Sequence, residues 1–194
     1  MKILNFVSIA LLCAGLTACG YFDKGPAEEA IKAASQAVDS VRADGSKFAS
    51  EQFKQLEGAL KAAQDDFAKG EYKAALATAK DLGAKAQEVA KAAADKKAAL
   101  TKSWEETSAG ISQALDAVKK KLDELAAAKK LPKEFTKEKL AELRSAADAA
   151  TKEFDDAKAA AGADVAKAVE TANALKTKVA EIIQGLGING EASK

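Results

Sequence analysis

The chain has 194 residues, of which 30 are lysine or arginine, 29 are aspartate or glutamate and none is histidine. This near-neutral balance predicts neither a nucleic-acid surface nor a polybasic membrane patch, because both need a clustered excess of positive charge. Without histidine, and with only two cysteines, the chain lacks the commonest general base and the usual zinc ligands. We therefore predict a protein that is not an enzyme and uses no cofactor or metal.

The N-terminal segment has the layout of a secretory signal peptide. A positive charge at Lys2 precedes an apolar run that ends in small residues before a cysteine, Leu16-Thr17-Ala18-Cys19. With about 16 apolar positions, this run is too short for a comfortable membrane-spanning helix. We predict that residues 1–18 are a signal peptide, and the other cysteine, Cys13, would be removed with it.

The run from Leu16 to Cys19 resembles the lipobox of bacterial lipoproteins. The resemblance implies that Cys19 is acylated, becomes the first residue of the mature chain and anchors it to a membrane. Gly20 fits the pattern of lipoproteins that are sorted to the outer membrane, with the body expected in the periplasm. Residues 19–25 would then be a lipidated tether. The alternative is an ordinary secreted protein with a stray cysteine near its cleavage site.

Apolar residues recur at helical spacing along almost the whole remaining chain, and no run alternates like a strand. Pro26, a favoured first-turn residue, predicts the start of a first helix that ends at Asp44-Gly45. A second helix is expected over residues 50–69. Gly70 breaks the chain, and a third helix is expected to begin near Glu71.

The apolar stripe of the third helix continues far beyond one bundle. Its spacing predicts a single helix over residues 71–128, a length that favours coiled-coil packing. Small and polar residues over 107–110 interrupt the stripe, so a kink or break there is the alternative.

The second half of the chain repeats the first. A shift of 87 places residues 48–67 on 135–154, and beyond a lengthened turn the shift becomes 93. This alignment pairs Phe67 with Phe154, so both are predicted to lie in equivalent core positions.

We predict an all-α fold of two tandem three-helix antiparallel bundles, with one long central helix shared between them as an option. The units are expected over residues 26–106 and 107–186, followed by a flexible tail over 187–194. This layout resembles spectrin-type repeats. The segment from Phe67 to Ala75 resembles part of a family of alanine-rich helical envelope proteins of unknown function, and also the turn of tetratricopeptide units.

Few residues carry recognisable chemistry. Adjacent carboxylates at 65–66, 105–106 and 155–156 point in different directions on a helix and indicate a solvated face. The glycines at 185, 187 and 190 have the spacing of a dinucleotide fingerprint but follow a helix instead of a strand, which favours a helix stop. The terminal Lys194 resembles that of bacterial lipoproteins joined covalently to peptidoglycan through their last lysine.

The functional prediction is a non-catalytic, lipid-anchored envelope protein that acts as a periplasmic spacer or as an adaptor for another envelope protein, and that binds no nucleic acid. Two alternatives remain open. One is a covalent peptidoglycan tether through Lys194. The other is a conditionally folded protective protein, because residues 91–99 resemble late-embryogenesis-abundant repeats.

Overall fold

The computed structural model describes the backbone of residues 3–188 and the side chains of residues 23–188. Over this range the chain forms helices and no strand, which confirms the all-α prediction. The helices are α1 (Ile3–Phe48), α2 (Ser50–Ala68), α3 (Tyr72–Ala127), α4 (Lys137–Ala161) and α5 (Val165–Gly185). The chain divides into two compact units, the first reaching Lys96 and the second starting at Lys97.

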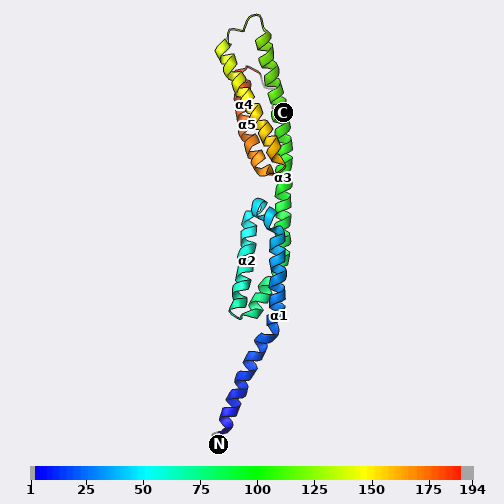
Figure 1. Ribbon diagram of the computed structural model, residues 1–194, viewed down its shortest axis with the longest axis vertical. Coiled ribbons are helices and arrows are strands. Elements are labelled where there is room, and N and C mark those ends of the chain that lie inside the picture. The colour runs from blue at the N-terminus through cyan, green and yellow to red at the C-terminus, as the bar shows by residue number, and fades with distance from the viewer. Residues whose placement is uncertain (1–2, 189–194) are drawn as a thin grey trace. The chain divides into compact units, whose positions relative to one another are not determined.

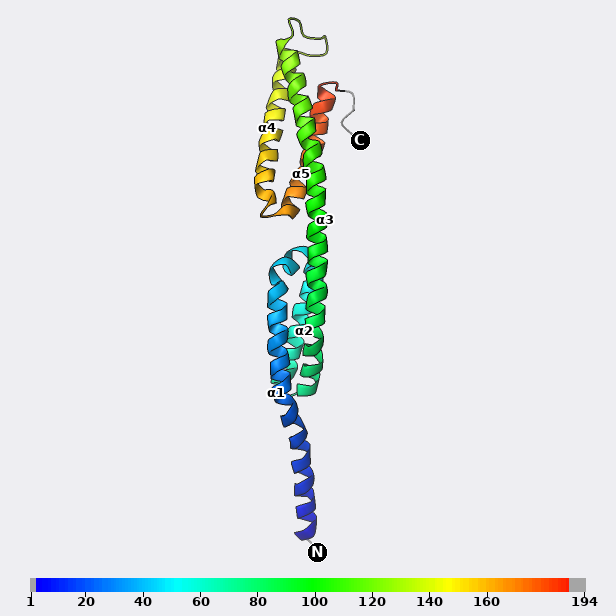
Figure 2. The same cartoon turned by 90° about the vertical axis from the view of Figure 1, so that its right-hand side faces the viewer.

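The first unit packs α1 and α2 against the N-terminal part of α3, and the three segments lie side by side in Figures 1 and 2. One apolar cluster joins them, with Val38, Leu56 and Leu82 among its most completely buried side chains. Alanines fill much of the remaining core, at Ala34, Ala49, Ala63, Ala79, Ala86 and Ala93. Such small side chains let helices approach closely but bury little area each.

Two predictions about α1 are wrong. The helix does not start at Pro26: it begins upstream at Ile3, so the expected tether over 19–25 is helical and the proline lies inside the helix. A proline there removes one backbone hydrogen bond without ending the helix. Nor does α1 end at Asp44-Gly45, since it continues to Phe48. Gly45 is instead a site of close packing, where an added Cβ would lie 3.0 Å from atoms of both Phe53 and Val89.

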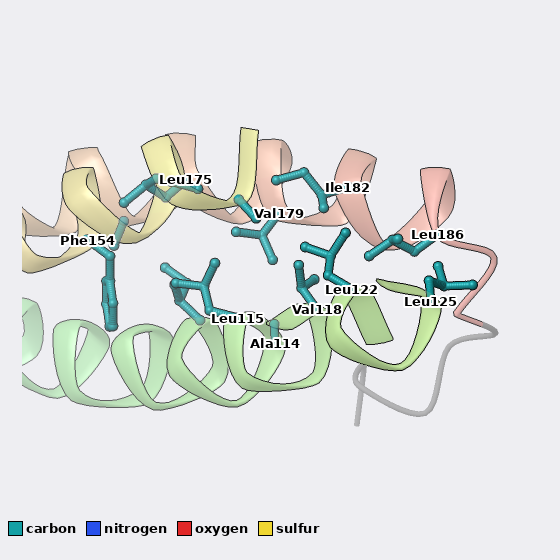
Figure 3. Close-up of a cluster of buried hydrophobic side chains, with 14 of the residues drawn as sticks. Ala114, Leu115, Val118, Leu122, Leu125, Phe154, Leu175, Val179, Ile182 and Leu186 are labelled. Carbon is teal, nitrogen blue, oxygen red and sulfur yellow. The ribbon is translucent and has the colours of Figure 1, made fainter. Parts of the chain in front are cut away.

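The second unit packs the C-terminal part of α3 against α4 and α5. In Figure 3, Leu115, Val118 and Leu122 of α3 point toward Leu175, Val179 and Ile182 of α5. The unit boundary lies between Lys96 and Lys97, not after residue 106 as expected. Trp104 thus belongs to the second unit, where it packs against the second cluster with its ring 6.4 Å from that of Phe154.

Helix α3 runs unbroken from Tyr72 to Ala127, so the predicted long helix is confirmed and the break over 107–110 does not occur. The hydroxyls of Thr101 and Ser108 donate to the backbone carbonyls of Lys97 and Glu105, at 2.9 and 3.2 Å. These side-chain hydrogen bonds form within the helix and do not draw its backbone into another conformation. No residue between Ala93 and Ile111 is buried. Between Ala93 and Trp104 no apolar side chain packs against either core cluster, so this part of the helix depends on its own backbone hydrogen bonds and on the high helix propensity of alanine and lysine.

The pairing of Phe67 with Phe154 is wrong by two helical turns. The buried residues of α2 are Phe53, Leu56, Leu60 and Ala63, and those of α4 are Ala147, Ala150, Phe154 and Ala157. Both sets have the spacing three, four, three, which matches Phe154 with Leu60. Phe67 is only half-buried, and its ring meets that of Tyr72 edge-on at 5.1 Å.

The lengthened turn is also wrong, because both units connect their last two helices through three residues, 69–71 and 162–164. The additional residues lengthen the helix itself: α4 has 25 residues and α2 has 19. The shift of 93 holds for the next helix. It carries six buried positions of α3 onto five buried positions of α5 and its C-cap residue, namely 75, 79, 82, 86, 89 and 93 onto 168, 172, 175, 179, 182 and 186.

The α2–α3 turn depends on a glycine in the left-handed region. Gly70 has φ +83°, the Gly70 amide donates to the Phe67 carbonyl at 3.0 Å, and the Glu71 amide donates to the Asp66 carbonyl at 2.9 Å. This bonding pattern is a Schellman motif, which satisfies the last carbonyls of α2.

Gly70→Ala should therefore destabilise the first unit by about 1 to 2 kcal/mol, through backbone strain alone. No atom lies within 4 Å of the added Cβ, so no clash contributes. The measurement is a urea denaturation curve. Gly58→Ala is the matched control. Gly58 lies inside α2, where the space around an added Cβ is equally open, and the change should stabilise the first unit by about 0.5 to 1 kcal/mol. Equal effects of the two changes would contradict the turn geometry.

Candidate functional site

The two residues to which the sequence assigns covalent chemistry lie where the structure gives no side-chain detail. Cys19 falls within the bounds of α1, but side chains are described only from Asp23 onward. Lys194 lies outside the described residues. Acylation of Cys19 and linkage of Lys194 to peptidoglycan therefore stay predictions.

The adjacent carboxylates lie on the solvated surface, as expected. Asp155 accepts from Lys158 at 2.7 Å, and Asp156 pairs with Lys152 at 3.3 Å. The earlier pair behaves in the same way, with Asp65 at 3.1 Å from the Lys61 ammonium. Because Asp155 and Asp156 have different lysine partners, as do Asp65 and Asp66, the two members of a pair do not converge on one proton or cation.

Ion pairs between helices are the surface feature that sequence reasoning missed. They join Arg42 of α1 to Glu57 of α2, Asp123 of α3 to Arg144 of α4 at 2.5 Å, and Glu153 of α4 to Lys178 of α5 at 2.7 Å. The partners are far apart in the chain, so no local spacing indicates them. Such exposed pairs contribute little stability each, but they favour one register between neighbouring helices.

Arg42 has the most elaborate environment of these residues. Its guanidinium donates to Asp39 at 2.9 Å and to Glu57, and it lies 5.5 Å from the centre of the Phe53 ring. The hydrogen bonds to Asp39 and Glu57 raise the pKa of Arg42 above its ordinary value. The side chain is exposed, so the cluster positions α1 against α2 and offers no enclosed reaction site.

The interiors of both units are apolar throughout. Among residues 23–188 no polar or charged residue is buried, and no buried side-chain nitrogen or oxygen lacks a hydrogen-bond partner. Over the same residues, no group of three or more histidine, cysteine, aspartate or glutamate side chains is placed to hold a metal ion. Enzymes usually shift the pKa values of catalytic acids and bases by burying these groups. Residues 23–188 contain no buried acid or base.

The glycine-containing C-terminal segment begins with a helix stop, as predicted. Gly187 has φ +62°, its amide donates to the Gln184 carbonyl at 3.0 Å, and the Ile188 amide donates to the Ile183 carbonyl at 3.2 Å. This is a second Schellman motif, and Ile183 and Ile188 both pack against the second core cluster. The third glycine, Gly190, lies outside the described residues.

Comparisons with known proteins gave no match. No protein-family model matches the chain. Neither the curated proteins nor the solved structures give a match. Within the described residues, no helix combines the length and the apolar character needed to cross a membrane.

Proposed function

We propose that this chain is a non-catalytic envelope lipoprotein, anchored in the outer membrane through acyl chains on Cys19. Its helical body acts in the periplasm as a spacer or as an adaptor for another envelope protein. The observation that carries the proposal is the run from Leu16 to Cys19 behind a short apolar segment. Acyl chains suit this purpose because each buried methylene contributes about 0.8 kcal/mol, and two or more chains hold a protein stably on a bilayer.

The nature of the body supports the non-catalytic part of the proposal. Both cores are built from apolar side chains, and the charged residues lie outside them as helix-to-helix or intrahelical pairs. Large apolar residues such as Leu56 and Leu175 are fully buried. This favours a body that is folded before it meets a partner over a hydrophilic, conditionally folded chain.

Cys19→Ala should abolish acylation and move the protein from the membrane fraction to the soluble or uncleaved pool. The change removes the only thiol that remains once residues 1–18 are cleaved. The measurement is intact-mass analysis of the purified protein together with fractionation of the cells.

The matched control is Cys13→Ala, which removes the other thiol. It should leave both the acylated mass and the membrane location unchanged. A mature chain that starts at a residue other than Cys19, or an acylated product from Cys19→Ala, would overturn the proposal.

A further inference from the structure

The near-neutral total charge conceals one strongly basic place in the second unit. Residues 129–139, here called the basic loop, contain five lysines and two glutamates. They cover most of the connection between α3 and α4 and the first turn of α4. The basic loop thus has a local excess of three positive charges in a chain whose total is +1.

No other described connection between helices has this character. The α1–α2 connection is the single residue Ala49, the α2–α3 turn is Lys69-Gly70-Glu71, and the α4–α5 turn is Gly162-Ala163-Asp164. These are neutral or carry one negative charge. A three-helix unit of this kind therefore does not require the five lysines, because the first unit makes the corresponding α1–α2 connection without them.

The basic loop is held in place from the inside. Phe135 is 8% exposed, and both it and Leu131 pack against the second core cluster. The Phe135 amide donates to the Pro132 carbonyl at 3.0 Å, and the Thr136 hydroxyl accepts from the Lys139 amide at 3.1 Å. The apolar residues are anchored, and the lysines between them are exposed on a fixed backbone.

Among the described residues, only one of the five lysines has a local contact through its ammonium: Lys139 donates to the Glu134 carbonyl at 3.5 Å and lies 5.2 Å from the centre of the Phe135 ring. Lys129, Lys130 and Lys133 are exposed and form no ion pair with any residue of the described chain. Lys137 and Lys139 occupy the first turn of α4, where the helix dipole favours acidic side chains over basic ones. Five lysines at one end of a bundle also repel one another. This cost suggests that they serve an external anion.

We propose that the basic loop binds the surface of a bilayer that contains anionic phospholipids. Lysines on flexible stems suit a diffuse layer of phosphate headgroups. A single phosphate in a fixed site would need buried donors, and none of residues 23–188 is both polar and buried. Single-stranded nucleic acid would need exposed aromatic rings for stacking, and the aromatic ring of this loop, Phe135, is buried.

The test uses the full chain reconstituted into light vesicles of phosphatidylcholine. These are mixed at low salt with sucrose-loaded heavy vesicles, either of phosphatidylcholine alone or with roughly a third phosphatidylglycerol to supply a negative surface potential. Sedimentation then gives the partition of the protein onto the heavy vesicles. We expect partition onto the phosphatidylglycerol vesicles above the phosphatidylcholine background, and its loss in about 1 M salt, where the Debye length falls to about 3 Å.

The decisive variant is Lys129→Gln, Lys130→Gln and Lys133→Gln combined. Each lysine near an anionic surface contributes about fivefold, so the partition coefficient should fall roughly 100-fold. The matched control combines Lys85→Gln, Lys167→Gln and Lys176→Gln, which removes the same charge from exposed helix faces. The proposal would be overturned if the partition coefficient did not depend on phosphatidylglycerol or did not fall in the triple loop variant. It would also be overturned if the control variant lowered the partition coefficient by the same factor. A thermal melt of each variant checks that the surface substitutions leave the fold intact.

Discussion

Replacing Phe154 with alanine should destabilise the second unit by about 3 to 5 kcal/mol, the cost of truncating a fully buried phenylalanine. The side chain is 3% exposed, and Figure 3 shows it directed from α4 toward α3. Trp104 lies beside it, and the Lys158 ammonium is 4.6 Å from the ring centre. The truncation would leave a cavity among the leucine, valine and isoleucine side chains of the second core cluster. Chemical denaturation of the full chain, followed by the fluorescence of Trp104, measures the loss.

Phe67→Ala is the control, because the sequence repeat makes the two phenylalanines equivalent and the structure does not. Phe67 is half-buried and has an edge-on contact with Tyr72. We expect a smaller loss of about 1 to 2 kcal/mol, from partial burial and the aromatic pair. Similar losses at Phe67 and Phe154 would show that the repeat alignment, with its shift of 87, describes the core better than the structural register.

The second large effect is expected at Leu82, which is fully buried among the three helices of the first unit. Leu82→Ala should cost about 2 to 5 kcal/mol. The two core clusters share no residue, so we expect the loss to be confined to the first unit. Hydrogen exchange followed by mass spectrometry should show lower protection in α2 and unchanged protection in α4.

Leu175→Ala is the mirror experiment, since Leu175 occupies the corresponding position of the second unit and is also fully buried. It should lower protection in α4 and leave α2 unchanged. If either substitution lowered protection equally in both helices, the chain would unfold as one cooperative body, and the division at Lys96 would have no energetic meaning.

Much of the fold could be predicted from the sequence because helix signals are local. The boundaries of α2 and α3 and the end of α5 follow from apolar spacing and from glycines that end helices, such as Gly70 and Gly187. The error at Phe67 and Phe154 has a physical cause. A shift of seven residues, about two helical turns, brings a residue back to nearly the same face of the helix. Matching apolar residues along that face therefore does not distinguish two alignments that differ by seven residues.

Other features depended on distances that a linear pattern does not contain. The pair between Glu153 and Lys178 joins two helices, and Trp104 packs against Phe154, which lies 50 residues further along the chain, in the same unit. The basic loop was not predicted for a different reason. The net charge of the whole chain is +1, which does not reveal a local excess of three positive charges. The roles of Cys19 and Lys194 are predicted from the sequence alone.

The stretch of α3 between Ala93 and Trp104 has a mechanical consequence. Its residues have no buried side chain, so a pulling force applied along the chain is resisted there mainly by the hydrogen bonds of a single helix. Isolated helical turns open and re-form at little cost, whereas either core must lose its packed apolar contacts before it yields. The stretch would therefore lengthen first under load and act as a reversible spring, while both bundles stay folded.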